Sequence, residues 1–341
     1  MNKLSILLPA IALMIALSCQ TKKLKIMCIG DSITQGKVRN DSISELSYRF
    51  WLWEKLDSMG YEVDMLGSND IWFNEDRTNM VATPVSHYTG HTFDRNHEGF
   101  YGIRTGKFLN GGFTHDSVKY ASFSERTKDM IPDVAFIHLG TNDSKADSAE
   151  TIGYLKGIID VLHQKNPSMK IFIAKLTTGW VRYVNHSIDS VVSECNSKYP
   201  GQVIVAVDQA AGYVNCPEHH MAMTFDWAHP NPRGQKAMAD KWFKALMSVN
   251  DKTAPVFDAT ARIDSLSDST AVISWPAATD NKWIAGYNVY IDGIKSNWRY
   301  SEGSDQPAQC IALVAGNTYT LKGITPTAKL MIQVSAIDFA N

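Results

Sequence analysis

The sequence predicts an α/β protein in which helices cover both faces of a parallel sheet, followed by a small all-β sandwich. Three observations predict this. Short apolar runs alternate with amphipathic stretches from Leu24 to about Ser248. The runs are almost continuously hydrophobic, which is typical of strands covered on both faces. From Asp251 on, the sequence pattern changes to short stretches in which apolar and polar residues alternate, separated by turn residues. This pattern is typical of a β-sandwich.

The strands and helices of the first part can be placed one by one. The apolar runs that predict its strands are LKIMCIG from Leu24, YEVDMLG from Tyr61, DVAFIHLG from Asp133, KIFIAKL from Lys170 and QVIVAVD from Gln202. The helical patterns between them run from Ser47 to Met59, Glu150 to Gln164, Asn185 to Lys198 and Pro232 to Met247. Strand, helix and strand repeated in this way predict a parallel sheet with right-handed crossovers.

One stretch does not follow the strand–helix alternation of the first part. The stretch from Asn69 to Gly112 has no clear period, and loops of such length are usually functional or mobile. The last helix begins with Pro232, where the missing N–H of proline costs nothing.

Length and composition limit the classes of protein. A chain of 341 residues is longer than one ordinary domain needs, and 44% hydrophobic residues predict a globular protein with a sizeable core. A formal net charge of -2 gives no reason to expect nucleic acid as a partner. The chain is rich in tryptophan and tyrosine. Core packing accounts for most of these residues, and a minority is expected to form a sugar-binding face.

Residues 1–19 have the pattern of a signal peptide. One lysine is followed by an apolar run from Leu4 to Leu17, which is too short to span a bilayer comfortably. The run ends at Ser18-Cys19, which resembles a bacterial lipoprotein signal, although Ala16 stands where leucine is usual. We therefore expect export to the periplasm, outer membrane or cell surface, with membrane attachment through a lipidated Cys19. The alternative is a plain secretory signal that is cleaved nearby.

Neither the cysteines nor the histidines predict a metal site. No Cys or His cluster has metal-ligand spacing. Cys28 lies inside the first apolar run and is expected in the core, and nothing requires a disulfide between Cys195 and Cys216. His138 is expected as a satisfied core or supporting residue. The remaining histidines of interest, expected on exposed loops or beside the pocket, are His87, His91, His97, His219 and His220.

The C-terminal strands are expected in TAVISW, GYNVYIDG, CIALVAGNTYTL and KLMIQVSAID. Residues 254–341 resemble a fibronectin type III domain, with Trp275 in the second strand and AGYNVYIDG as the third strand and its turn. Two features depart from that family. Leu330 stands where a corner tyrosine is usual, and the chain stops at AIDFAN, near the expected start of the final strand. We therefore expect a sandwich that lacks this strand or gains it from outside this sequence.

Four short stretches carry the residues that ester hydrolysis needs. They are Gly30-Asp31-Ser32-Ile33-Thr34, HEGFYGIRTG from His97, Gly140-Thr141-Asn142-Asp143 and DWAHPN from Asp226. Taken singly, each has an ordinary explanation as a turn, a helix cap or a flexible loop. The first and third stretches follow strands, so both are expected at the carboxyl edge of the sheet, where open α/β folds place their sites. The fourth stretch leads into the last helix and can return to that edge.

The chemistry assigns a role to each residue type. A hydroxyl that attacks an ester needs a base of near-neutral pKa, which histidine supplies, and a carboxylate holds the imidazole in one tautomer. Ser32, His229 and Asp226 are the candidates for these roles. The intermediate's negative oxygen needs fixed donors. The candidates are the N–H of Ser32, the N–H of Gly102 and the side-chain amide of Asn142, while Asp31 and Asp143 are expected to support the site.

These four stretches look like the sequence blocks of the SGNH hydrolases, also called the GDSL esterase/lipase family. The resemblance covers Lys25 to Leu246 and implies an SGNH hydrolase domain at residues 24–250, with a three-layer, flavodoxin-like sheet. It implies Ser32 as nucleophile, His229 as base and Asp226 as its orienting acid, with Gly102 and Asn142 in the oxyanion hole. Gly99 is the alternative to Gly102, which is preferred because the family's glycine usually ends a Gly-x-x-Gly-like stretch. No metal or organic cofactor is needed.

The residues between the blocks look most like the bacterial carbohydrate-esterase branch, which includes acetylxylan-esterase-like enzymes. Two segments depart from that branch, Ile71 to Thr92 and Thr177 to Asn185, and both are expected to border the cleft. The leading hypothesis is an exported serine esterase that removes acetyl groups from an oligo- or polysaccharide, with Trp72, Trp180 and Trp227 as candidates for the sugar-binding surface. The alternatives are a lipase, lysophospholipase or thioesterase of the same family, and a non-catalytic glycan-binding surface protein.

Overall fold

The computed structural model describes residues 23–39, 42–75, 77–78, 82–250, 253–258, 260–280, 284, 286–292, 309–314, 316–323 and 331–337. The expected signal peptide and its Cys19 lie outside the described residues, and so does Leu330. In the described part of the chain, no helix is long and apolar enough to cross a membrane.

The first part of the chain forms a parallel sheet with the strand order β10-β9-β8-β1-β4, and the short β5 also pairs with β1. All of these neighbours run parallel. The strands are β1 (Leu24–Gly30), β4 (Val63–Leu66), β5 (Glu98–Gly99), β8 (Val134–His138), β9 (Lys170–Lys175) and β10 (Val203–Asp208). Taken in chain order, the five long strands lie 2-1-3-4-5, which is the flavodoxin-like arrangement. The predicted fold class is confirmed.

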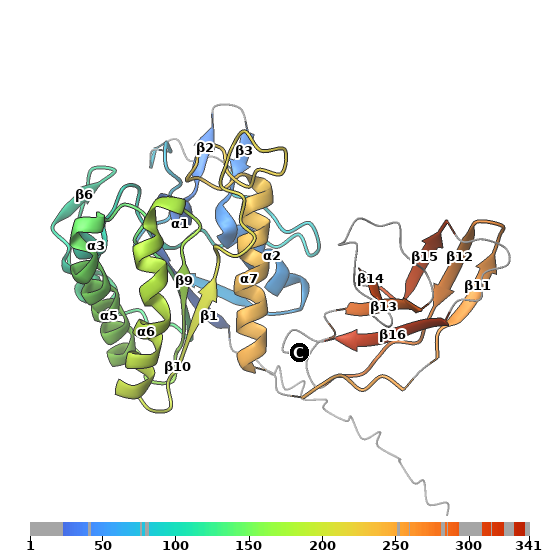
Figure 1. Ribbon diagram of the computed structural model, residues 1–341. Helices are drawn as coiled ribbons and strands as arrows, with labels where there is room; N and C mark the ends of the chain where they lie inside the picture. Colours follow the sequence, from blue (N-terminus) through green and yellow to red (C-terminus); the bar gives the residue numbers. More distant parts are fainter. Residues whose placement is uncertain are drawn as a thin grey trace, which may run out of the picture.

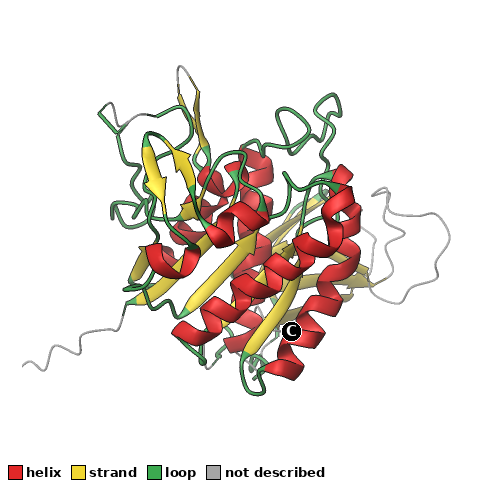
Figure 2. Cartoon of the chain, turned by 90° about the vertical axis from the view of Figure 1, so that its left-hand side faces the viewer, coloured by secondary structure: helices red, strands yellow, loops and turns green. Residues whose placement is uncertain are grey.

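Helices cover both faces of this sheet (Figures 1 and 2). On one side α2 (Ser47–Ser58) packs against α7 (Pro232–Asn250). On the other side α5 (Ser148–Lys165) packs against α3 (Thr105–Asn110) and α6 (Arg182–Lys198). The predicted helix ends agree to within a few residues. Helix α2 stops before Gly60, whose φ of 81° lies in the left-handed region that favours glycine at a helix end.

The place where the strand order reverses lies between β1 and β8. Gly30 at the end of β1 pairs with His138 at the end of β8, so the chain leaves both strands at the same edge. It leaves β1 through the short helix α1 (Ser32–Gln35). In open α/β sheets, the crevice at such a reversal is the usual binding site. Residues 26–29 of β1 are fully buried, because helices cover both faces of this interior strand.

The long stretch without a period contains more structure than its sequence indicates. Besides β5 and α3 it has isolated bridges that pair Asn69 with His97 and Val85 with Thr92. The smaller elements elsewhere in this part are β2 (Lys37–Arg39), β3 (Ser42–Glu45), β6 (Phe113–His115), β7 (Val118–Tyr120), α4 (Phe123–Arg126), η1 (Lys145–Asp147) and η2 (Gly179–Val181). The β2–β3 and β6–β7 hairpins were not predicted.

The C-terminal part consists of two antiparallel three-stranded sheets. One has the order β11-β12-β15 and the other β14-β13-β16, and the strands are β11 (Arg262–Leu266), β12 (Thr270–Ser274), β13 (Gly286–Asp292), β14 (Gln309–Val314), β15 (Thr318–Lys322) and β16 (Met331–Ile337). Trp275 packs edge-on against Tyr287 in their shared core. The small all-β region is therefore present, and its assignment as fibronectin type III stays a prediction.

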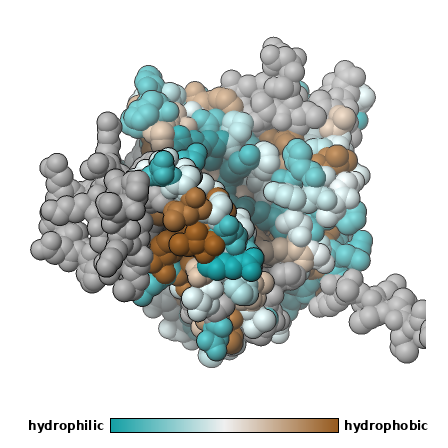
Figure 3. Space-filling view, turned by 90° about the vertical axis from the view of Figure 1, so that its right-hand side faces the viewer, coloured by the Kyte–Doolittle hydropathy of each residue, from teal (hydrophilic) through white to brown (hydrophobic). Residues whose placement is uncertain are grey.

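Apolar side chains are exposed on the C-terminal part, and three of them are Val256, Ile263 and Leu266. In Figure 3, which views the molecule from the right-hand side of Figure 1, an apolar area is bordered by polar residues.

The cysteines make no cross-link in the described part of the chain, because Cys28, Cys195 and Cys216 are all free. The structure therefore holds no Cys195–Cys216 disulfide.

Candidate active site

Ser32 lies at the start of a tight turn from β1 into α1. The Asp31 carboxylate caps this turn, because its Oδ1 accepts the Ile33 N–H at 3.0 Å. The turn requires glycine at position 30, where a Cβ atom would lie 2.1 Å from Oγ1 of Thr34 and 2.5 Å from the His138 carbonyl oxygen. The side chain of Ser32 is thereby fixed at the carboxyl edge of the sheet, where 9% of the residue is exposed.

His229 lies in a turn that directly precedes α7. The Asp226 carboxylate accepts the backbone N–H of His229 at 2.8 Å and that of Ala228 at 3.3 Å, which folds the turn back on itself. Phe225 closes it by donating its N–H to the His229 carbonyl at 2.9 Å. Trp227 has a φ of 71°, and a bulky residue in this region signals a backbone held under strain.

The structure brings the three predicted catalytic side chains into one chain of hydrogen bonds. Nε2 of His229 lies 3.0 Å from the Ser32 hydroxyl, and Nδ1 lies 2.9 Å from each carboxylate oxygen of Asp226. With its proton on Nδ1, the ring donates to Asp226 and leaves Nε2 free to accept the serine proton. Burial raises the pKa of Asp226, but hydrogen bonds from His229 and Ala228 and the nearby imidazole bring it below its ordinary value. Asp226 therefore stays ionised near neutral pH.

The predicted oxyanion donors differ in whether they already donate hydrogen bonds to other groups of the protein. In the part of the chain that the structure describes, the N–H groups of Ser32 and Gly102 donate to no other protein group. The alternative, Gly99, donates its N–H to Nδ1 of His97 at 2.9 Å. This contact favours Gly102, whose φ of 69° also suits glycine. Asn142 donates one amide hydrogen to the Ile103 carbonyl at 3.1 Å and keeps a second.

Asp143 joins the third sequence stretch to the second. Its carboxylate accepts the Thr105 hydroxyl at 2.7 Å and the Thr105 N–H at 3.1 Å, where α3 begins. It also accepts the Thr151 hydroxyl from α5 at 3.3 Å. These bonds fix the loop that carries Asn142 against the loop that carries Gly102, so Asp143 supports the two candidate donors together.

Asp31 is fully buried below the triad. Burial raises its pKa to about 6, although the hydrogen bond from Ile33 and the charge of His229 act in the opposite direction. Its second oxygen, Oδ2, has no hydrogen-bond partner in the described part of the chain. Ionisation of the Asp31 carboxyl group in the folded protein is therefore unfavourable.

Of the remaining histidines, only some occupy the surroundings that the sequence predicts. His138 is buried as expected, but neither ring nitrogen has a partner in the described part, and burial lowers its pKa to about 4. His97 was expected on an exposed loop, and this is wrong. It is fully buried, because its Nε2 bonds the Ile71 carbonyl at 3.1 Å within the folded loop. His87 and His91 are exposed and pair with Glu54 and Asp57 of α2.

His219 and His220 lie in the loop before the triad's turn, with their rings stacked at 4.4 Å. Among the described residues, no three His, Cys, Asp or Glu side chains are grouped so that they could hold a metal ion.

Two of the three tryptophans expected on a sugar-binding surface are exposed. Trp180 is 53% exposed and donates its Nε1–H to the Thr141 carbonyl at 3.1 Å, beside Asn142. Trp227 is 48% exposed between the two triad partners Asp226 and His229. The expectation for Trp72 is wrong. Only 1% of Trp72 is exposed, because the guanidinium of Arg95 covers its ring at 4.1 Å.

Sequence reasoning missed two aromatic residues at the site. Phe73, the neighbour of Trp72, stacks on Tyr101 with ring centroids 3.8 Å apart. Tyr101 also lies parallel to the His229 ring to within 8°, with centroids 6.4 Å apart. A signal for Tyr101 was present, since it directly precedes Gly102. Phe73 lies in a stretch without periodicity and had none.

Comparisons with known proteins relate this chain to one family and to several solved structures. Residues 28–237 match the GDSL-like lipase/acylhydrolase family. Among solved structures, the chain is similar to a family 3 carbohydrate esterase from Talaromyces cellulolyticus, with 25% identity, 65% of this chain and 96% of that chain covered, and a TM-score of 0.48. A mutant acetyl esterase with acetate ion shares 24% identity over 65% and 96% of the two chains, with a TM-score of 0.49.

A further comparison concerns a shorter stretch of the sequence. Chitinase C of Streptomyces lividans is 32% identical over 94 residues, which are 28% of this chain and 13% of that protein.

Proposed function

This chain belongs to the GDSL-like lipase/acylhydrolase family, and from that premise we propose that it is a serine esterase that removes acetyl or other short acyl groups from carbohydrates. The observation that carries the proposal is the hydrogen bond of 3.0 Å between the Ser32 hydroxyl and Nε2 of His229. A serine hydroxyl gains nucleophilicity when a positioned base removes its proton. Family membership alone supports hydrolysis of carboxylic esters, and the sugar and the acetyl group belong to the proposal.

The proposed reaction has two halves. The Ser32 oxygen attacks the ester carbonyl as His229 takes its proton, and the tetrahedral oxyanion is stabilised by donors from Ser32, Gly102 and Asn142. The intermediate collapses to acyl-Ser32, and His229 returns the proton to the departing sugar oxygen. A water molecule then attacks the acyl group, again losing a proton to His229. Collapse releases the carboxylic acid and restores the Ser32 hydroxyl.

The aromatic residues around the triad support a carbohydrate substrate. Trp180, Trp227 and Tyr101 are each about half exposed, and the latter two adjoin His229 in sequence or in space. Flat rings offer apolar faces on which the C–H groups of a pyranose can pack, while polar groups beside them can bond its hydroxyls. The sequence resemblance to the carbohydrate-esterase branch points the same way.

The test is acetate release from acetylated xylan, pectin, mannan and sialylated glycans, compared with hydrolysis of 4-nitrophenyl esters of increasing chain length. We expect turnover of at least one acetylated glycan and falling activity beyond short acyl chains. Good activity on long-chain esters, with none on any acetylated glycan, would instead support the lipase-type alternative. Activity on no ester would support the glycan-binding alternative.

The proposal includes export as a lipoprotein, supported by the apolar run that ends at Cys19. Labelling of bacterial cells that produce the full chain with a radioactive fatty acid should mark the protein. The Cys19→Ser variant should lose the label. A labelled variant, or an unlabelled original protein, would contradict lipidation.

A further inference from the structure

A stacked pair of aromatic rings lies beside the candidate base. The rings of Phe73 and Tyr101 are parallel to within 3°, with centroids 3.8 Å apart. Lys37 lies over the Phe73 ring at 5.6 Å. Tyr101 is 46% exposed, and its ring is nearly parallel to the imidazole of His229. Tyr101 is therefore the member of the pair that presents an aromatic surface to solvent next to the site of chemistry.

Both aromatic residues are hydrogen-bonded to the end of the nucleophile's helix, at its last residue Gln35 and at Gly36, which follows it. Phe73 donates its N–H to the Gly36 carbonyl at 2.9 Å. The fully buried Gln35 accepts the Tyr101 N–H with its Oε1 at 2.7 Å and donates its Nε2–H to the Ile71 carbonyl at 3.3 Å. One side-chain amide therefore ties the segments of both rings to the four-residue helix that begins with Ser32.

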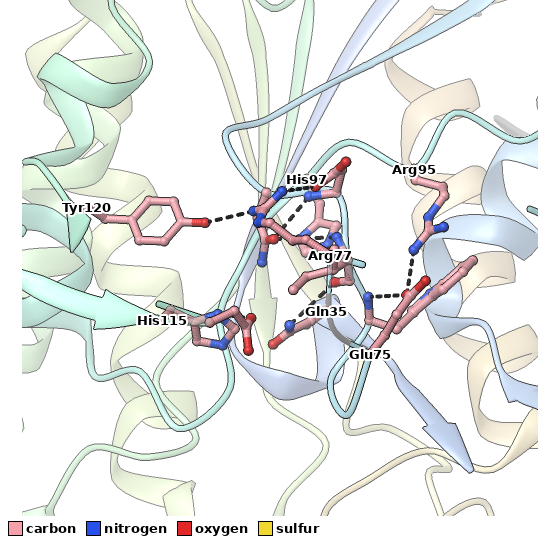
Figure 4. A network of polar contacts seen from close by, with 12 residues as sticks. Gln35, Glu75, Arg77, Arg95, His97, His115 and Tyr120 are labelled. Carbon is pink, nitrogen blue, oxygen red and sulfur yellow. Dashed lines mark hydrogen bonds and ion pairs between the residues drawn. The ribbon is translucent and has the colours of Figure 1, made fainter. Parts of the chain in front are cut away.

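The segment that carries Phe73 is itself fixed on its far side. Glu75 pairs with Arg95 and accepts the Trp72 N–H, and Arg77 bonds Asp70 and the Tyr120 hydroxyl. Figure 4 shows Gln35 within this network, together with the side chains of Glu75, Arg77, Arg95 and Tyr120. The segment that carries Phe73 is therefore held in place by its own ion pairs and hydrogen bonds.

We propose that the Phe73–Tyr101 pair is a docking platform for a sugar ring of the substrate, and that it sets which acetylated glycans the enzyme uses. The inference rests on the proposed function and names the part of the substrate that is recognised. A platform fixed to the nucleophile can hold a sugar at a constant distance from Ser32, which places the ester for attack. The phenol oxygen of Tyr101 adds a hydrogen-bonding group at the edge of the aromatic surface.

The test compares two substrates in the full-length protein. One is 4-nitrophenyl acetate, which has no sugar, and the other is whichever of acetylated xylan, pectin, mannan or sialylated glycan gives the highest turnover. For Tyr101→Ala we expect kcat/KM on the glycan to fall about tenfold further than on 4-nitrophenyl acetate, a factor typical of one lost stacking contact. Tyr101→Phe keeps the ring and should recover most of this difference. The Tyr101 N–H that bonds Gln35 is a backbone group and is present in both variants.

Tyr88→Ala is the matched control, because Tyr88 is an exposed tyrosine on the Ser86–Gly90 turn and does not belong to the site. It should change neither rate. Calorimetric titration of the deacetylated glycan into Ser32→Ala, with and without Tyr101→Ala, measures binding without chemistry and should show about tenfold weaker binding for the double variant. Equal losses of kcat/KM on both substrates, together with unchanged binding, would contradict the docking platform but not the proposed esterase function. Absence of glycan turnover by the unaltered enzyme would overturn the proposed function and the platform with it.

Discussion

The hydroxyl of Ser32 lies 3.0 Å from Nε2 of His229, although 197 positions separate the two residues in the chain. The contact arises because β1 is an interior strand of the sheet and α7 packs on α2, so the turn before α7 returns to the carboxyl edge of β1. Serine and base are thus carried by different elements of the same domain. Each can be removed separately without removing a core side chain.

Ser32→Ala should abolish nearly all turnover. By analogy with serine hydrolases whose nucleophile has been removed, we expect kcat to fall by about 10⁶-fold. The measurement is the rate of acetate release at saturating substrate. Ser190→Ala alters an exposed serine on α6 and should be as active as the original protein. If Ser32→Ala kept a tenth of the activity, another nucleophile would have to be sought.

Asp226→Asn should lower kcat by about 10⁴-fold, because an amide can donate to Nδ1 and so favour the tautomer that cannot accept the serine proton. Substrate binding does not require this carboxylate, so KM should change much less than kcat. Steady-state kinetics with 4-nitrophenyl acetate separates the two constants. A larger change in KM than in kcat would indicate that Asp226 contacts the substrate instead of orienting His229.

The strands and the long helices could be predicted because each depends on a local pattern. The candidate triad could be predicted because its four stretches follow one another in order and two of them end strands. LKIMCIG reads as a buried strand without further context, and Gly-Asp-Ser at its end marks the edge where it stops. The aromatic platform could not be predicted in this way. Trp72 and Phe73 are adjacent and both apolar, and Phe73 is bonded through its N–H to the Gly36 carbonyl, 37 positions earlier. The local sequence does not indicate which of the two rings is buried.

His97 shows the same limit for a polar residue. A histidine in a loop is usually exposed, but this loop is folded against β1 and the Asn69 segment, and both ring nitrogens of His97 bond backbone groups within it. Such contacts between distant loop segments produce no periodic pattern in the sequence. The residues that hold the site together were therefore harder to find than those that carry its chemistry.

The buried carboxyl of Asp31 should make stability depend on pH. Its pKa is raised to about 6, chiefly by burial, while an aspartate in the unfolded chain releases its proton near pH 4. Between these values the folded state holds the proton more tightly, so the contribution of Asp31 is present below about pH 4 and is lost as the pH rises through 6. A difference of about two pH units corresponds to roughly 3 kcal/mol.

Asp31→Asn keeps an oxygen for the Ile33 N–H and removes the titration. We expect its free energy of unfolding, relative to the original protein, to improve by up to about 3 kcal/mol between pH 4 and pH 7. Urea unfolding at several pH values, followed by tryptophan fluorescence, measures this difference. Asp129→Asn replaces an exposed aspartate and is the matched control for the loss of one carboxylate. A difference for Asp31→Asn that is the same at every pH would mean that Asp31 has an ordinary pKa.

Gln35→Leu tests the amide that joins the nucleophile's helix to Tyr101 and Ile71. The substitution leaves the Tyr101 N–H without its partner, and an unpaired buried group costs about 1–3 kcal/mol. The Ile71 carbonyl keeps its bond to Nε2 of His97. Because the Tyr101 N–H directly precedes Gly102, we also expect kcat on 4-nitrophenyl acetate to fall at least about tenfold, since a displaced oxyanion donor weakens transition-state stabilisation.

Gln209→Leu separates these two effects of Gln35→Leu. Gln209 is also a fully buried glutamine, whose Nε2 bonds the Met238 carbonyl at 3.3 Å, and it follows β10 at the edge of the sheet. Its replacement should lower the melting temperature by a similar amount and leave kcat unchanged at temperatures where the protein is folded. Equal kcat values for the two variants would show that Gln35 has a structural role only. A fall in kcat that is confined to Gln35→Leu would instead show that the Gln35 amide holds the Tyr101–Gly102 loop in position relative to Ser32.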